Sequence, residues 1–221
     1  MTYVISDIHG RYDKYTAMLD KIRLGDDDAL YVLGDIIDRH DDGLKIMLDI
    51  IRRPNAFLIM GNHEAMMLDA LLGMTEISEE SVEKLMMWLL NGGESTMEAY
   101  LGLGEPDRIL ILDTLEALLY YKELEAGGKK FVLLHGGLEN FSPERPLGSY
   151  PRDDIVWTDT DFDAEYFPDK YLVVGHMPTT VFCDEPKIFR KGRIFDVDCG
   201  IADKSDTLGC LRLDDFSEFY V

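Results

Sequence analysis

FLIMGNHEAMM, residues 57–67, passes within a few positions from an apolar run to an amide, an imidazole and a carboxylate, and then back to apolar residues. The residues before Gly61 have the length and character of a buried strand. Polar side chains placed where such a strand ends project from a rigid scaffold into a crevice, which is where ligands bind in α/β sheets. The stretch therefore predicts a strand, a polar site and a helix, in that order.

Four further apolar runs, rich in β-branched and aromatic residues, also have the length of buried strands. With the first stretch, the predicted strands span residues 2–6, 29–33, 56–60, 130–134 and 170–174. Helical patterns follow the first three strands, with apolar faces at Tyr15, Met18, Leu19 and Ile22, at Leu44, Met47, Leu48 and Ile51, and at Ala65, Leu68 and Leu72. This alternation predicts parallel βαβ units.

Residues 73–119 carry helical patterns only, and we interpret them as a helical insertion with a helix start at Ser78. Its Met86 and Met87 are expected to pack in the core. A hairpin is predicted around 127–128 and further strands near 192–198, 208–214 and 217–221, so the second half should form a second sheet. Without a flexible linker or repeat, the chain is expected to be one domain over 1–221.

Polar residues able to bind a metal or a phosphate follow each of the five predicted strands named above, and four of the five histidines lie at these strand ends. The residues are Asp7, His9, Asp35, Asp38, Arg39, Asn62, His63, His135 and His176. Each has an ordinary explanation when taken alone: a strand-end histidine is usually only hydrogen-bonded, and an aspartate there can cap the next helix. Their joint occurrence at successive strand ends favours a shared site.

Imidazoles, carboxylates and an amide oxygen, with no thiolate among them, suit a divalent metal such as Mn²⁺, Fe or Zn²⁺. The number of candidates indicates two ions. Asp7 and His9, on a segment expected to be extended, can hold one, and Asp35 can bridge to a second ion held by Asn62, His135 and His176. Two cations about 4 Å apart suit the in-line attack of a metal-activated hydroxide on phosphorus.

Composition excludes several partners. A net charge of −21 and a pI near 4.4 argue against nucleic acid and anionic membranes. The sequence runs directly into a strand without a leader, and no apolar run approaches the roughly 20 residues needed to span a bilayer, so we expect a cytoplasmic protein. Its three cysteines are odd in number and are expected to be reduced.

Three short blocks carry a family resemblance: Ser6 to Gly10 (SDIHG), Gly34 to Arg39 (GDIIDR) and Gly61 to Glu64 (GNHE). In this order they resemble the phosphoprotein phosphatase branch of the calcineurin-like metallophosphoesterases, and the resemblance runs from residue 2 to about residue 200. The segment 88–100 is similar to bacterial members. The resemblance implies an α/β (α+β) fold, a sandwich of two β-sheets flanked by helices, with a dinuclear metal centre at the sheet edge.

Roles then follow by position. The resemblance implies metal ligands at Asp7, His9, Asp35, Asn62, His135 and His176, holding two divalent ions, Mn²⁺ first and Fe or Zn²⁺ as alternatives. His63 would be the general acid, Asp38 would orient it, and Arg39 would clamp a phosphate oxygen. A surface ion pair of Asp38 with Arg39 is the competing interpretation.

The sequence departs from the family pattern at three places. His40 stands where the family has glycine, and could narrow the approach to the site or be tolerated in an altered turn. No arginine follows Trp157 before Arg190, so Arg152 is the nearest candidate for a second phosphate clamp, with a surface role equally open. Cys199 replaces a threonine in a loop at 196–200, where we expect it to be a small wall residue.

Three functions are consistent with these residues. The first is a phosphomonoesterase acting on phosphoserine and phosphothreonine in proteins. The alternative is hydrolysis of dinucleoside polyphosphates or nucleotides, and the third is a metal-containing binding module without catalysis. Retention of both His63 and Asp38 argues against the third. The expected partner is a phosphoprotein or a phosphorylated small molecule.

Overall fold

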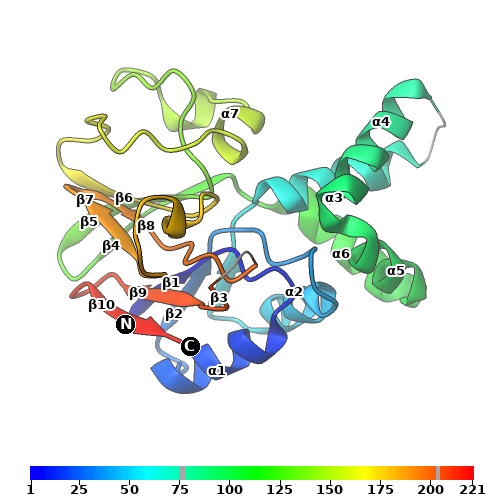
Figure 1. Cartoon of the computed structure of the whole chain (residues 1–221), viewed down its shortest axis with the longest axis horizontal. Coiled ribbons are helices and arrows are strands. Elements are labelled where there is room, and N and C mark those ends of the chain that lie inside the picture. The colour runs from blue at the N-terminus through cyan, green and yellow to red at the C-terminus, as the bar shows by residue number, and fades with distance from the viewer. Residues whose placement is uncertain (75–77, 203–204) are drawn as a thin grey trace.

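Two five-stranded mixed sheets face each other in the computed structural model, which describes residues 1–74, 78–202 and 205–221 (Figure 1). The first sheet has the order β10-β9-β1-β2-β3. Its strands are β1 (Thr2–Ile5), β2 (Ala29–Val32), β3 (Ala56–Leu58), β9 (Gly209–Arg212) and β10 (Ser217–Tyr220). The second sheet has the order β4-β5-β6-β8-β7. Its strands are β4 (Tyr121–Ala126), β5 (Lys129–Leu134), β6 (Lys170–Val174), β7 (Phe189–Lys191) and β8 (Ile194–Asp196).

The five strands predicted first are all present, and the β1-β2 and β2-β3 pairs are parallel as expected. Strands β5 and β6 also pair in parallel. The predicted hairpin is confirmed by the antiparallel pair of β4 with β5. The second half forms the second sheet as predicted, but its last two strands, β9 and β10, join the first sheet instead. Strand β9 returns to pair antiparallel with β1, and β10 follows it. Both faces of β9 are buried: Leu211 packs between the two sheets and Cys210 packs toward the helices. A strand that is apolar on both faces suits a position inside a sheet.

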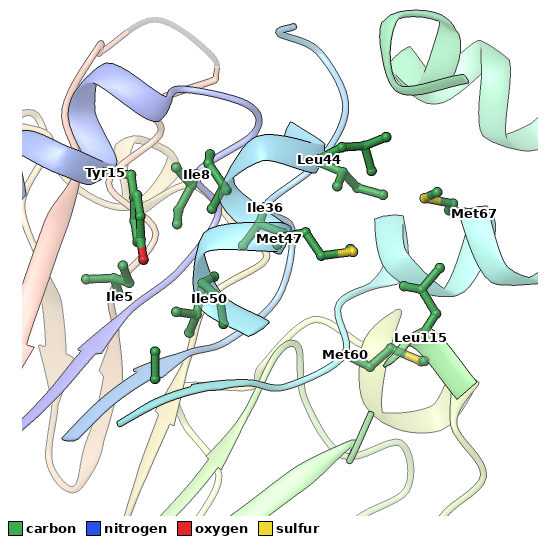
Figure 2. Packing of buried hydrophobic residues seen from close by; sticks show 14 of the residues in the cluster. Ile5, Ile8, Tyr15, Ile36, Leu44, Met47, Ile50, Met60, Met67 and Leu115 are labelled. Carbon is green, nitrogen blue, oxygen red and sulfur yellow. The ribbon is translucent and has the colours of Figure 1, made fainter. Parts of the chain in front are cut away.

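Helices α1 (Tyr12–Ile22) and α2 (Gly43–Arg52) cover the outer face of the first sheet. Figure 2 shows buried side chains of both helices: Tyr15 of α1 and Ile50 of α2 lie near Ile5 of β1, whereas Met47 of α2 points away from it. Between the two sheets lies a second apolar cluster that includes Val4, Phe131 and Phe195. The sandwich is therefore held by apolar layers on either side of the first sheet.

The predicted helical insertion is confirmed outside residues 75–77, which lie beyond the described residues. Within it lie α4 (Glu79–Trp88), the turn η1 (Leu89–Gly93), α5 (Glu94–Gly102) and α6 (Glu105–Ala117). Helix α3 (Asn62–Gly73), the helix predicted after the third strand, leads into it. We call these helices the helical arm, because they project away from the sandwich (Figure 1). Ser78 caps α4 as predicted, since its hydroxyl accepts a hydrogen bond from the Ser81 amide.

The expectation that Met86 and Met87 are core residues was wrong, because their side chains are 48% and 52% exposed. Helix α4 packs against α3 and leaves its opposite face in solvent, so only Trp88 at its end is buried. Apolar spacing alone could not show that the helix has a neighbour on one side only.

Shorter elements complete the chain: η2 (Leu147–Ser149), α7 (Asp153–Val156) and η3 (Thr179–Val181). The cysteines are unpaired, as expected, with Cys199 and Cys210 buried and Cys183 half-buried. Within the described part of the chain, no helix is both long and apolar enough to cross a membrane.

Candidate metal centre

The predicted metal ligands converge at one edge of the sandwich. Strands β1, β2 and β3 of the first sheet and β5 and β6 of the second all end there. They deliver Asp7, His9, Asp35, Asn62, His135 and His176, all buried except the half-buried His176. Strand ends from both sheets therefore form a single polar site, which the sequence could predict because all these strands run in the same direction within their sheets.

The backbone at the site is strained rather than regular. Left-handed φ angles occur at Asp7 (55°), His9 (45°), Asp35 (52°), Asp38 (67°) and His176 (73°). The expectation that Asp7 and His9 lie on an extended segment was therefore wrong. Residues other than glycine adopt this conformation at a cost of about 1–3 kcal/mol each, and such strain gathers where function requires a particular side-chain direction.

Asp35 lies between two groups of ligand-type residues, His9 with His63 on one side and His135 with His176 on the other. Its Oδ2 is 3.7 Å from His9 Nε2, whereas its Oδ1 is 3.4 Å from His135 Nε2. The two carboxylate oxygens thus face different imidazoles, as a bridging ligand requires.

The imidazole orientations fit a cation. His9 Nδ1 donates to the Ile37 carbonyl at 2.9 Å and His135 Nδ1 donates to the Leu33 carbonyl at 2.6 Å, which leaves each Nε2 as an acceptor directed into the site. Asn62 Oδ1, also an acceptor, lies only 2.9 Å from His135 Nε2. Two acceptors this close repel each other unless a cation lies between them or the Asn62 amide exchanges its oxygen and nitrogen positions. These atoms therefore suit the coordination of a divalent ion.

The electrostatics of the site point the same way. Burial, together with the charges of neighbouring basic groups, lowers the pKa of His9 well below its ordinary value and that of His176 to about 3. Both rings are thus neutral at pH 7 and able to bind a metal. Burial, with the charges of Asp7 and Glu64, raises the pKa of Asp35. A cation would offset this cost of burying carboxylates together.

Glu64 holds the backbone of Asp35 in place and was missed in the sequence analysis. Its buried oxygens accept hydrogen bonds from the amides of Asp35 (2.7 Å), Ile36 (3.0 Å) and Gly61 (3.0 Å). A side chain on Gly61 would overlap Asp35 Oδ1, so only glycine fits there. The spacing of Gly61 and Glu64 at a helix start was the available signal, because a glutamate three residues after an N-cap commonly turns back to it.

His63 and Asp38 form the pair expected from the sequence. His63 Nδ1 lies 2.7 Å from Asp38 Oδ2, and Arg39 Nη2 lies 3.3 Å from His63 Nε2. Burial opposes a charged ring, but the charges of Asp35 and Asp38 outweigh it and raise the pKa of His63. Since Nδ1 is held by Asp38, Nε2 faces the site. The guanidinium of Arg39 is exposed beside it.

Three further residues, Arg152, His40 and Asp198, lie outside the two groups of ligand-type residues. Arg152 forms a bidentate ion pair with Asp69 of α3, with Nη1 to Oδ1 at 2.8 Å and Nη2 to Oδ2 at 2.7 Å. His40 turns back on the scaffold, where its Nδ1 donates to the His9 carbonyl at 2.9 Å, and it belongs to neither ligand group. Asp198 is buried close enough to Asp7 and Asp35 that, after burial itself, their charges raise its pKa. Asp198 lies in the loop 196–200 that the sequence analysis singled out for Cys199, but it was not named there as a site residue.

Comparison with known proteins identifies relatives of two kinds. The family model described as calcineurin-like phosphoesterase matches residues 2–204. Serine/threonine-protein phosphatase 2 of Salmonella typhimurium is 33% identical over 140 residues, covering 60% of this chain and 56% of that protein. The symmetrical bis(5'-nucleosyl)-tetraphosphatase of Wigglesworthia glossinidia brevipalpis is 38% identical over 80 residues, covering 35% of this chain and 29% of that protein.

The matches thus extend over little more than half, or less, of these relatives' length. Among solved structures, a candidate diadenosine tetraphosphatase superposes with a TM-score of 0.70 at 16% identity, covering 100% of this chain and 92% of that one. This likeness confirms the predicted two-sheet fold. The individual site residues stay predictions.

Proposed function

The chain belongs to the calcineurin-like phosphoesterase family, and from that membership we propose that it is a metal-dependent phosphomonoesterase acting on phosphoserine and phosphothreonine in proteins. One observation carries the proposal: the two oxygens of Asp35 face separate imidazole groups, while His63 directs Nε2 toward the same space. A two-ion site beside a proton donor is what hydrolysis of a phosphate ester needs.

In this proposal the six predicted ligands would hold two divalent ions, Mn²⁺ first and Fe or Zn²⁺ as alternatives. When bound, such ions lower the pKa of water to give a nucleophile at neutral pH and offset the charge of the phosphoryl oxygens. The remaining steps belong to the side chains. Arg39 binds a phosphoryl oxygen through its planar, permanently charged fork.

Hydrolysis forms a bond from water oxygen to phosphorus and breaks the bond from phosphorus to the serine oxygen, so the departing alkoxide must gain a proton. His63 supplies it from Nε2, because Nδ1 is engaged with Asp38 at 2.7 Å. The raised pKa of His63 keeps this proton available near neutral pH. Asp38 fixes the ring and stabilises its charged form.

The small number of arginines beside the site favours a monoester substrate over a polyphosphate. Of the arginines that the sequence analysis singled out, only Arg39 lies beside His63, whereas Arg152 is paired with Asp69. A net charge of −21 further opposes a highly charged polyphosphate.

The second candidate, hydrolysis of a dinucleoside polyphosphate, has one observation of its own. The ring of Trp157, which is 36% exposed, meets His176 edge-on with ring centroids 6.5 Å apart. An exposed indole beside the site offers a face on which a nucleobase could stack.

A turnover panel tests the two candidates. Purified protein with Mn²⁺ is given a phosphoserine peptide, a phosphothreonine peptide, mononucleotides and diadenosine tetraphosphate, with Asp35→Ala as the control for contaminating phosphatases. We expect kcat/KM to be highest on the phosphopeptides. Symmetrical cleavage of diadenosine tetraphosphate at a higher kcat/KM would replace the first candidate by the second, and turnover of none of them would reject both.

A further inference from the structure

The carboxylate of Asp38 is completely buried on a left-handed residue, and most of what holds it comes from the helical arm. Trp88 Nε1 donates to Asp38 Oδ2 at 2.9 Å and lies 3.2 Å from Oδ1. The Asp38 amide donates to Thr96 Oγ1 at 3.0 Å. A buried carboxylate needs such donors, because an unsatisfied oxygen costs about 1–3 kcal/mol and a carboxylate more.

The arm is shaped locally to make these contacts. Trp88 ends α4 and has no exposed surface, and the turn η1 that follows brings Gly93 against its indole and Gly92 against Arg39. A Cβ on Gly93 would lie 2.6 Å from Trp88 Nε1, so a side chain there would displace the indole. The Gly92 carbonyl, at a residue with φ of 100°, accepts a hydrogen bond from the Arg39 amide at 3.0 Å.

We propose that Trp88 is a positioning residue for the reaction: its indole N–H fixes the Asp38 carboxylate, and thereby sets the direction of His63. The hydrogen bonds run in series from Trp88 to Asp38 and from His63 to Asp38, sharing the oxygen Oδ2. Without the indole N–H, the carboxylate can rotate about its χ2 angle, and the ring that depends on it loses a fixed direction.

This inference rests on the proposed role of His63 as proton donor and extends it to the helical arm. It explains why residues 88–93 (WLLNGG) contain both a tryptophan and paired glycines: the indole supplies the donor, Gly93 leaves room for the indole, and Gly92 allows a close approach to Arg39. Asp38 and Trp88 are 50 positions apart, so their pairing depends on the fold.

Trp88→Phe tests the proposal in the Mn²⁺-loaded protein, since it removes the N–H and keeps an aromatic ring. We expect kcat to fall about 10-fold on a phosphoserine peptide, the lower end of the effect usual for an outer hydrogen bond. On p-nitrophenyl phosphate, whose leaving group needs no proton, the fall should be below about 3-fold. Metal content should not change.

Two variants separate positioning from general damage. Tyr15→Phe removes another buried hydrogen bond of the same core, from Tyr15 to Asp49 at 2.8 Å, and should leave the ratio of the two activities unchanged. If Trp88→Phe does not fold, Gly93→Ala retains the tryptophan but displaces its indole, and should give the same substrate-dependent loss. In an Asp38→Asn background, Trp88→Phe should change the ratio no further, because the two act in series.

A ring-nitrogen NMR spectrum gives a readout independent of turnover. The His63 Nδ1–H resonance should be strongly downfield, should disappear in Asp38→Asn and should shift in Trp88→Phe. An equal loss on both substrates, or an unshifted resonance, would overturn the role of Trp88. A shifted resonance in a protein without phosphatase activity would support Trp88 while rejecting the proposed function.

Discussion

Arg152 and Asp69 form a two-pronged ion pair that ties the start of α7 to helix α3 of the helical arm, with nitrogen to oxygen distances of 2.8 and 2.7 Å. The guanidinium also reaches Asp153 through Nε at 2.9 Å. Three of the five N–H donors of Arg152 are thus used within the protein. This geometry favours a structural role over the second phosphate clamp that the sequence leaves open.

A double-mutant cycle of Arg152→Ala and Asp69→Ala should separate these roles. We expect each single variant to lower the free energy of unfolding, with a coupling of about 1 kcal/mol, because the pair is bidentate and only partly exposed. KM for a phosphopeptide should change less than about 3-fold in both variants. A rise in KM of about 10-fold or more in Arg152→Ala, absent from Asp69→Ala, would show that Arg152 binds the phosphate.

Asp35→Ala should remove more metal than His9→Ala. The two oxygens of Asp35 face different imidazoles, so its loss weakens both predicted ion sites, whereas His9 contributes to one. We expect about two Mn²⁺ per chain in the unaltered protein and about one in His9→Ala, measured by elemental analysis and calorimetric titration. A single tight site retained in Asp35→Ala would contradict the bridging role.

Glu64 should matter for both folding and metal affinity. Glu64→Ala leaves three buried amides without an acceptor, and we expect a loss of about 2–4 kcal/mol of unfolding free energy. Mn²⁺ affinity should fall about 10- to 100-fold, because Asp35 loses the contact that holds its backbone. Glu64→Gln keeps an acceptor oxygen and should recover much of both losses. Equal damage in the two variants would show that charge, rather than hydrogen bonding, is what the site requires.

The metal-free protein should lose stability with acid through His176. The pKa of this ring is about 3 in the folded protein and about 6.5 in the unfolded chain. Between these values the unfolded chain binds a proton that the folded protein does not, so this contribution to stability falls as the pH drops from about 6.5 toward about 3. Urea unfolding in EDTA at about pH 7 and about pH 5 should show His176→Asn gaining relative to the unaltered protein at the lower pH. A constant difference would contradict the lowered pKa.

The site could be predicted from the sequence for those residues that directly follow a buried strand. Asp7, Asp35, Asn62 and His135 each come directly after a buried apolar run, and parallel strands place such ends together. Periodicity also located the arm, but not the side on which α4 lacks a neighbour.

Contacts made across the fold could not be predicted. The approach of Trp88 to Asp38 depends on the kink at Gly92 between α4 and α5, and the left-handed φ of Asp7 depends on the sandwich that surrounds it. Neither feature has a periodic pattern. The sequence likewise predicted that β9 belongs to the second sheet with its neighbours in the chain, although its partner is β1 near the N-terminus.

The position of His63 beside Asn62, with Asp38 behind it, leads to the last prediction. If His63 donates a proton to the leaving oxygen, its importance should depend on how much that oxygen needs one. A serine alkoxide leaves poorly without a proton, whereas p-nitrophenolate leaves readily. His63→Asn should therefore lower kcat by about 10²- to 10⁴-fold on a phosphoserine peptide and distinctly less on p-nitrophenyl phosphate.

Metal content decides between the remaining explanations, because the geometry also groups His63 with His9 and Asp35. A proton donor can be removed without loss of metal, so His63→Asn should retain both ions. Asp38→Asn should show the same dependence on the leaving group in milder form, since it only misdirects the ring. Loss of an ion from His63→Asn would make His63 a ligand, and equal losses on both substrates with the ions retained would make it an electrostatic stabiliser of the phosphoryl group.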